Sequence, residues 1–113
     1  MSKKSDIQYL GDMLDYAREA LNLIANRARP EYDNDRALQL ALSHAIMIIG
    51  EAASRVSAST RDASPEIEWS RISGMRNRLV HDYGNVDRGI VWDSTIEDVP
   101  PLITALEKIM SRS

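Results

Sequence analysis

The stretch 76-RNRLVHDYG-84 gathers side chains that could handle both a proton and a phosphate group. Arg76 carries a planar guanidinium, whose N–H donors suit phosphate oxygens. His81, one of only two histidines, titrates near neutral pH and can take or give a proton. Tyr83 could position a substrate or donate a hydrogen bond to a phosphate oxygen. Together these residue types could cleave RNA without a metal: the base takes the proton of a ribose 2′-OH, and the arginine stabilises the charge that develops on the phosphate.

The same spacing also allows a purely structural explanation, which is the stronger one on spacing alone. A cationic residue near a helix C-terminus interacts favourably with the helix dipole. Arg78 and Asp82 are four residues apart and could form a surface ion pair. Arg76 could pair with a carboxylate on a neighbouring helix.

Four helical segments are predicted by apolar residues that recur every three or four positions. They span about 5–29, 34–56, 69–83 and 93–110. The candidate N-caps, in that order, are Ser5 or Asp6, Asp33 or Asn34, Ser70, and Asp93 or Ser94. Nothing alternates like a strand for long. The predicted fold class is therefore all-α, an antiparallel bundle of four main helices in one domain over residues 1–113.

Prolines and glycines predict where these helices end or bend. Pro30 is expected to end the first helix, and Gly84 is a natural residue to follow the third. Pro100 and Pro101 predict a kink near Val99 in the fourth helix. The stretch 57–69, rich in Ser, Thr, Asp and Pro, is predicted to be a loop, with its final residues held on the core by Ile67 and Trp69.

Gly50 lies inside the second helix, where it weakens the helix but lets another backbone come close. The third helix has an apolar stripe of Ile72, Met75 and Leu79. Arg76 lies at the edge of that stripe on an ideal helix, and Tyr83 lies along the same direction two turns later. Trp69 and Trp92 flank the third helix and are expected to anchor its two ends.

The second helix is apolar over a wide arc, which predicts burial on more than one side. A homodimer would bury its surplus apolar surface, although it could simply be the central helix of a monomer. His44, in its middle, is more readily explained by packing or hydrogen bonding than by metal ligation. Glu51 could be solvated, or could pair with an arginine of the third helix.

The composition narrows the function classes. The chain has 113 residues, no cysteine and a net charge of −3, so disulfides and thiolate metal sites are excluded, and a general polyanion-binding surface is not expected. Between positions 71 and 88, however, four arginines outnumber two aspartates, which suits a local anion site. No secretory signal is visible, and the longest apolar run, 45-AIMII-49, is too short to span a bilayer. A cytoplasmic protein without membrane contact, cofactor or metal is expected.

The pattern Arg76, four residues, His81, one residue, Tyr83 resembles the Arg-x4-His-x-Tyr signature of HepT-like proteins in the HEPN superfamily. The surrounding segments are similar as well, and they cover nearly the whole chain. They read 50-GEAASRVS-57, 65-PEIEWSRISGMRNRLVHDYGNVD-87 and 90-IVWDSTIEDVPPL-102.

This resemblance implies a small all-α homodimer that acts as the toxin of a type II toxin–antitoxin pair. It implies a metal-independent endoribonuclease with Arg76 and His81 as the catalytic pair in a dimer cleft. Asn77, Asp82 and Glu51 are further candidates for supporting residues. The implied antitoxin is a minimal nucleotidyltransferase, which would silence the toxin by adding AMP to Tyr83. Two alternatives stay open: a non-catalytic dimer that binds nucleotide or RNA, or positions substrate for the nucleotidyltransferase, and a purely structural helical dimer.

Overall fold

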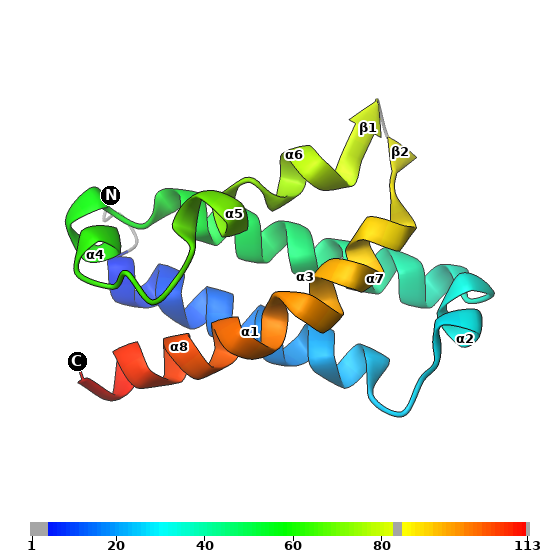
Figure 1. Cartoon of the computed structure of the whole chain (residues 1–113), viewed down its shortest axis with the longest axis horizontal. Coiled ribbons are helices and arrows are strands. Elements are labelled where there is room, and N and C mark those ends of the chain that lie inside the picture. Colours follow the sequence, from blue (N-terminus) through cyan, green and yellow to red (C-terminus); the bar gives the residue numbers. More distant parts are fainter. Residues whose placement is uncertain (1–4, 83–84, 113) are drawn as a thin grey trace.

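Two long helices, α1 (Asp6–Ile24) and α3 (Arg36–Arg55), run side by side in opposite directions (Figure 1). The computed structural model describes residues 5–82 and 85–112, and for residues 80–82 and 85 it describes the backbone alone. Helix α8 (Val99–Arg112) packs on α1. Four shorter helices, over residues 29–33, 69–73, 75–79 and 88–97, pack on α3, whose burial on more than one side is thereby confirmed.

The first helix begins where its cap was predicted. The Ser5 side chain accepts a hydrogen bond from the Gln8 amide, and the Gln8 side chain accepts one from the Ser5 amide, which is a reciprocal capping box. The helix ends at Ile24, earlier than predicted, and Asn26 follows with a left-handed φ of 61°. Asparagine tolerates that conformation better than most residues.

Pro30 does not end the first helix but lies at the start of a second, α2 (Arg29–Asp33). Proline fits the first turn of a helix, because the amide hydrogen that it lacks would have no intrahelical partner there. The next helix, α3, is capped by Asp35, which accepts from the Leu38 amide at 3.0 Å, rather than by Asp33 or Asn34.

Among the helices of the described residues, α3 is the one that is long and apolar enough to cross a membrane. Half of its apolar window is buried inside the protein. That is the environment of a core helix in a bundle, which passes the same test.

The stretch predicted as a loop contains a short helix, α4 (Ala58–Asp62). The carboxylate of Asp6 accepts hydrogen bonds from the hydroxyls of Ser57 and Thr60, and so ties α4 to the start of α1. Farther along, Ile67 is buried, and the Trp69 indole N–H donates to the Ser64 carbonyl at 2.9 Å. These two residues hold the stretch on the core, as predicted.

The third predicted helix is not continuous. It is divided into α5 (Trp69–Ser73) and α6 (Met75–Leu79), and Ser70 does not cap it, because α5 already includes Trp69. The helix stops at Leu79 instead of continuing to Tyr83. The Leu79 carbonyl oxygen instead accepts a hydrogen bond from the Asp87 amide at 2.7 Å.

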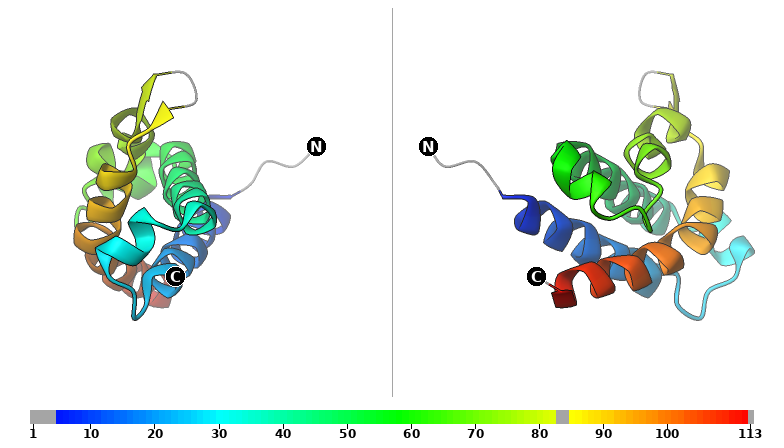
Figure 2. Two further views of the ribbon diagram at one scale, coloured as in Figure 1. Left: turned by 90° about the vertical axis from the view of Figure 1, so that its right-hand side faces the viewer. Right: turned by 60° about the vertical axis from the view of Figure 1, so that its left-hand side comes forward.

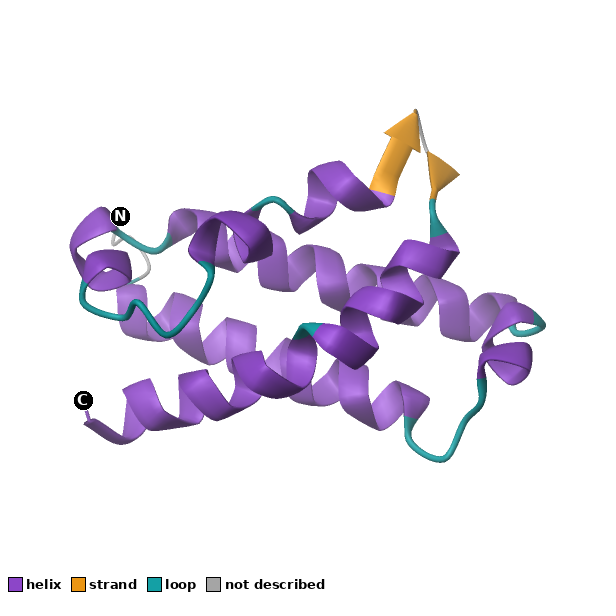
Figure 3. Ribbon diagram, viewed as in Figure 1, coloured by secondary structure: helices purple, strands orange, loops and turns teal. Residues whose placement is uncertain are grey.

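The chain then forms a short antiparallel hairpin of β1 (Val80–Asp82) and β2 (Asn85–Val86), which pairs Val80 with Val86. Figure 3 marks these strands among the helices, and Figure 2 shows the hairpin extending beyond the helical body. Gly84, the predicted residue after the third helix, lies outside the described residues.

The fourth predicted helix begins earlier than expected, as α7 (Arg88–Glu97). Asp87 caps it by accepting from the Ile90 amide at 3.0 Å, so neither Asp93 nor Ser94 is the cap. Trp92 therefore lies within α7, where its ring packs against Tyr32. A break at Asp98 separates α7 from α8, which confirms the kink predicted near Val99.

The fold is all-α, as predicted, with the short hairpin as an addition that the sequence pattern did not indicate. Its four main segments are α1, α3, the α5–α6 pair and the α7–α8 pair. The buried apolar residues of these segments form one hydrophobic cluster.

Candidate ribonuclease site

Arg76 projects from α6 next to a fully buried stripe. Ile72, Met75 and Leu79 are 4%, 0% and 0% exposed, which confirms the predicted apolar face. The Arg76 side chain itself is exposed. Within the described residues it makes no ion pair.

Gly50 lets the segment before Arg76 lie directly on the core helix. A Cβ atom at position 50 would lie 3.1 Å from the Ile72 carbonyl oxygen and 3.8 Å from the backbone nitrogen of Arg76. The prediction that Gly50 allows another backbone to come close is confirmed. The backbone that comes close is the one that carries Arg76.

Asp98 holds the same segment from the other side. Its side chain, 10% exposed, lies at the break between α7 and α8 and accepts a hydrogen bond from Arg71 Nε at 3.0 Å. Its other carboxylate oxygen lies 3.7 Å from Arg78 Nη2. The hydrogen bond to Asp98 raises the pKa of the Arg71 guanidinium above its ordinary value. One carboxylate thus joins α5 and α6 to the α7–α8 joint.

Arg78 was predicted to pair with Asp82, but the ion pair that the structure describes for it is with Asp98. The side chain of Asp82 lies outside the description. Two guanidinium nitrogens of Arg78 are buried with no hydrogen-bond partner among the described residues, and the same holds for the Asp98 oxygen that faces them. The 3.7 Å gap is too long for a hydrogen bond, so this contact is purely electrostatic.

His81 lies in β1 rather than in the last turn of a helix. Its backbone is placed by the hairpin, while its side chain lies outside the description. Tyr83 lies wholly outside the described residues. Arg76 and His81 therefore belong to different elements, a helix and a strand, joined by Leu79 and Val80.

The supporting residues behave differently from one another. Asn77 is exposed on α6 and remains a candidate for contact with substrate. Glu51 pairs with Arg55 on its own helix at 2.9 Å, so the suggestion that it pairs with an arginine of the third helix is wrong. That hydrogen bond also raises the pKa of Arg55.

His44 is exposed and lies edge-on against Tyr16, with ring centroids 5.9 Å apart. The pair lines a groove of about 520 Å³ between α1 and α3, with Asp15 and Glu19 also on its wall. Among the described residues, no group of three or more His, Cys, Asp or Glu could hold a metal ion.

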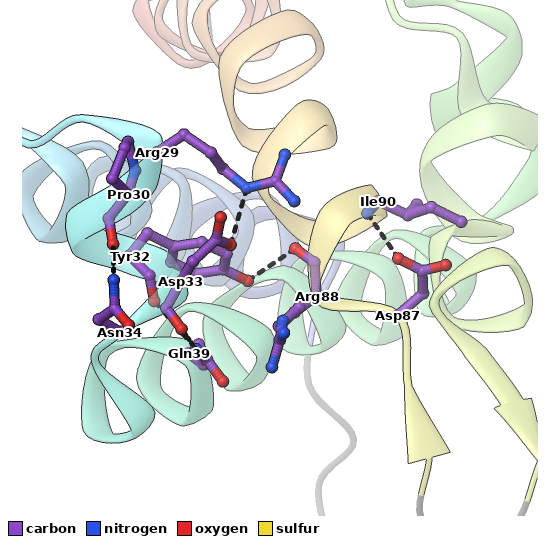
Figure 4. Close-up of polar contacts among 9 residues, drawn as sticks. All are labelled: Arg29, Pro30, Tyr32, Asp33, Asn34, Gln39, Asp87, Arg88 and Ile90. Atoms are coloured by element: carbon purple, nitrogen blue, oxygen red, sulfur yellow. Dashed lines mark hydrogen bonds and ion pairs between the residues drawn. The ribbon is translucent and has the colours of Figure 1, made fainter.

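Two residues that support the candidate site were not singled out from the sequence: Asp98 and Tyr32. The Tyr32 hydroxyl donates to the Arg88 carbonyl at 2.8 Å (Figure 4), at the start of α7 and next to the hairpin. A third, Asp87, caps α7. It could have been found from the sequence, because an aspartate directly before the first helical residue is a common N-cap.

Comparison with known proteins identifies the chain. The family model described as "Ribonuclease HepT-like" matches residues 13–109, which include Arg76, His81 and Tyr83. "Probable ribonuclease HepT" of Thermococcus cleftensis is 33% identical over 111 residues, covering 95% of this chain and 97% of that protein. "Putative RNase MJ1216" of Methanocaldococcus jannaschii is 30% identical over 110 residues, covering 97% of this chain and 91% of that protein. No solved structure matches significantly. The chain belongs to the ribonuclease HepT-like family.

Proposed function

We propose that this protein is a metal-independent endoribonuclease in which Arg76 and His81 act on the RNA phosphodiester. The observation that carries the proposal is the state of Arg76, which is exposed and without an ion pair in the described part of the chain, on a helix fixed by Gly50 and Asp98. An exposed arginine on a rigid support is suited to bind a phosphate. Family membership and the names of the relatives support ribonuclease activity.

The proposed reaction is an internal transfer on phosphorus. The His81 imidazole takes the proton of the ribose 2′-OH, and the 2′ oxygen attacks the adjacent phosphorus. The bond from phosphorus to the 5′ oxygen breaks, and that oxygen takes a proton from a protonated His81 side chain. Arg76 stabilises the negative charge on the non-bridging oxygens as it develops. The products are a 2′,3′-cyclic phosphate and a 5′-hydroxyl end.

The protein acts as a homodimer in this proposal. The surface of α3 supports the idea, because Leu40 is 55% exposed, and Met47 and Ile48 on the same helix are only partly buried. An isologous contact through this face would remove its apolar side chains from water.

The proposed biological role is that of a toxin held in check by a nucleotidyltransferase antitoxin. Addition of AMP to Tyr83 would place bulk and a phosphate charge in the same stretch as Arg76, where it would compete with the phosphate of RNA. This part of the proposal is supported by the Arg-x4-His-x-Tyr motif and by family membership.

The test is RNA cleavage by the purified protein, expressed alone, compared with Arg76→Ala and His81→Ala. Loss of a general base costs about 10²- to 10⁴-fold in rate, and a comparable loss is expected for the arginine. Arg18→Ala is the matched control, since Arg18 is an exposed arginine of α1 that pairs with Glu107. It should leave cleavage unchanged.

Three outcomes would contradict the proposal in different ways. Cleavage that survives both substitutions would show that these residues are not catalytic. Cleavage that disappears with a chelator would implicate a metal. A purified dimer that binds RNA or ATP but leaves RNA intact would instead indicate a binding module. Growth arrest that is relieved by a co-expressed nucleotidyltransferase, with a mass increase on Tyr83, would support the antitoxin part.

A further inference from the structure

We infer that Tyr32 is a positioning residue for the hairpin that carries His81, an inference that rests on the proposed function. Tyr32 is 0% exposed and lies on α2, far from the hairpin in sequence. Its hydroxyl donates to the Arg88 carbonyl at 2.8 Å (Figure 4). Its ring lies against that of Trp92, with centroids 5.0 Å apart. Both partners belong to α7, which follows directly after the hairpin.

Helix α2 is itself held rigidly by the core helix. Gln39 of α3 is buried, and its side-chain amide donates to the carbonyls of Tyr32 at 2.9 Å and Asp33 at 3.0 Å. These bonds satisfy the last carbonyls of α2, which a short helix leaves without internal partners. The position of the Tyr32 ring is therefore fixed relative to α3.

The residue next to Arg88 closes the base of the hairpin. The Asp87 amide donates to the Leu79 carbonyl at 2.7 Å, and the Asp87 carboxylate accepts from the Ile90 amide at 3.0 Å. Hydrogen bonds thus lead from α3 through α2 to the start of α7, and from there to the hairpin base at Leu79. His81 lies two residues beyond that base, in β1.

Arg76 depends on a different set of contacts. Its helix is held by Gly50 from α3 and by Asp98 from the α7–α8 joint, with no contribution from α2 among the described contacts. The bond from Asp87 also reaches Leu79 at the end of the Arg76 helix, but that helix has the contacts with Gly50 and Asp98 in addition, which the hairpin lacks. A change at Tyr32 should disturb proton transfer at His81 more than binding of the phosphate by Arg76.

The experiment compares Tyr32→Phe with the wild-type full-length protein. Phenylalanine keeps the ring against Trp92 and removes only the hydroxyl. Misplacement of a catalytic group by about 1 Å can cost 10²-fold, so we expect kcat for RNA cleavage to fall by about 10- to 100-fold, with KM changed less than about twofold. Assays run well below the melting temperature of the variant, so that all of the protein is folded.

The matched control is Ile109→Val, a core change on α8 far from the hairpin, which loses a buried methyl group. It should lower the melting temperature similarly and leave kcat unchanged. A second readout needs no activity: hydrogen exchange at the Asp87 amide, which donates to the Leu79 carbonyl at the base of the hairpin, should be faster in Tyr32→Phe than in Ile109→Val.

The two readouts separate the possible failures. A wild-type protein that never cleaves RNA would contradict the proposed function, and exchange alone would then show whether Tyr32 holds the hairpin. Exchange equal to that of the control would overturn the inference. Faster exchange with an unchanged kcat would overturn it as well, since the hairpin would be held by Tyr32 without any effect on catalysis.

Discussion

Gly50 of α3 faces the carbonyl oxygen of Ile72, and a methyl group at position 50 would lie 3.1 Å from that oxygen. That separation is tighter than an ordinary contact between a Cβ atom and a neighbour. The carbonyl belongs to the backbone of a helix and cannot rotate away. The absence of a side chain at position 50 therefore determines how closely α5 and α6 approach the core.

We expect Gly50→Ala to move the Arg76 segment outward and to lower both stability and RNA cleavage. Overpacking of a filled interior costs about 1–3 kcal/mol, which outweighs the gain of roughly 1 kcal/mol in helix propensity. Gly11→Ala in α1 is the control, because its Cβ would meet only the end of the Met110 side chain at 3.9 Å. Chemical denaturation should show Gly11→Ala at or above wild-type stability. A Gly50→Ala protein that is equally stabilised would show that the approach of α5 is not limiting.

Asp98→Asn should destabilise the protein and reduce its cleavage activity. The substitution removes the charge that faces Arg71 and Arg78 while keeping the shape, and it leaves buried guanidinium nitrogens beside a neutral amide. The expected loss for a buried group of this kind is about 1–3 kcal/mol. Glu107→Gln, in the exposed pair with Arg18, should change stability by less than about 1 kcal/mol. Equal melting temperatures for the two variants would contradict the role assigned to Asp98.

Tyr32 gives the protein a specific sensitivity to alkaline pH. Burial raises the pKa of its phenol to about 12, from 10.0. Above pH 10 the phenol ionises in the unfolded chain but not in the folded one, so the free energy of unfolding falls as the pH rises toward 12. The loss should be about 1.4 kcal/mol at pH 11. In Tyr32→Phe this loss should be absent, and urea titrations at pH 9 and 11 would measure the difference. The same loss in the variant would assign it to other groups.

Leu40→Glu should weaken the proposed homodimer. A charge in a buried apolar contact is costly to desolvate, whereas the side chain is 55% exposed in a single chain and tolerates the change there. Sedimentation at several concentrations should show dissociation of this variant at concentrations where the wild type is dimeric. Ile96→Glu on α7, at a side chain that is 49% exposed, is the control. A dimer lost only in the control would move the interface to α7.

The predictable parts of this fold are those that depend on near neighbours. The apolar spacing of Ile72, Met75 and Leu79 indicated a buried stripe, and Ser5 capped α1 through a residue three positions away. Gly50 could be predicted to allow a close approach because a glycine inside an apolar helix has no side chain to keep a neighbouring backbone away.

The end of the third helix was mispredicted because its cause is not local. The Leu79 carbonyl is taken by the amide of Asp87, so the helix cannot add another turn. Asp98 and Tyr32 escaped notice for a similar reason: they act through partners 27 and 56 residues away in sequence. No spacing rule relates positions so far apart, and only the packing of α2 and of the α7–α8 joint brings them together.

The two tryptophans lie at the two ends of the stretch that carries Arg76 and His81. Trp69 starts α5, and its indole N–H donates to the Ser64 carbonyl. Trp92 lies in α7, which follows the hairpin, and its ring packs at a tilt against Tyr32. A protein with one tryptophan replaced by phenylalanine therefore has a single tryptophan, at one chosen end. Emission from Trp92 would report on loosening of the hairpin base, and emission from Trp69 on loosening of α5. The chain thus contains its own pair of optical reporters for the two halves of the site.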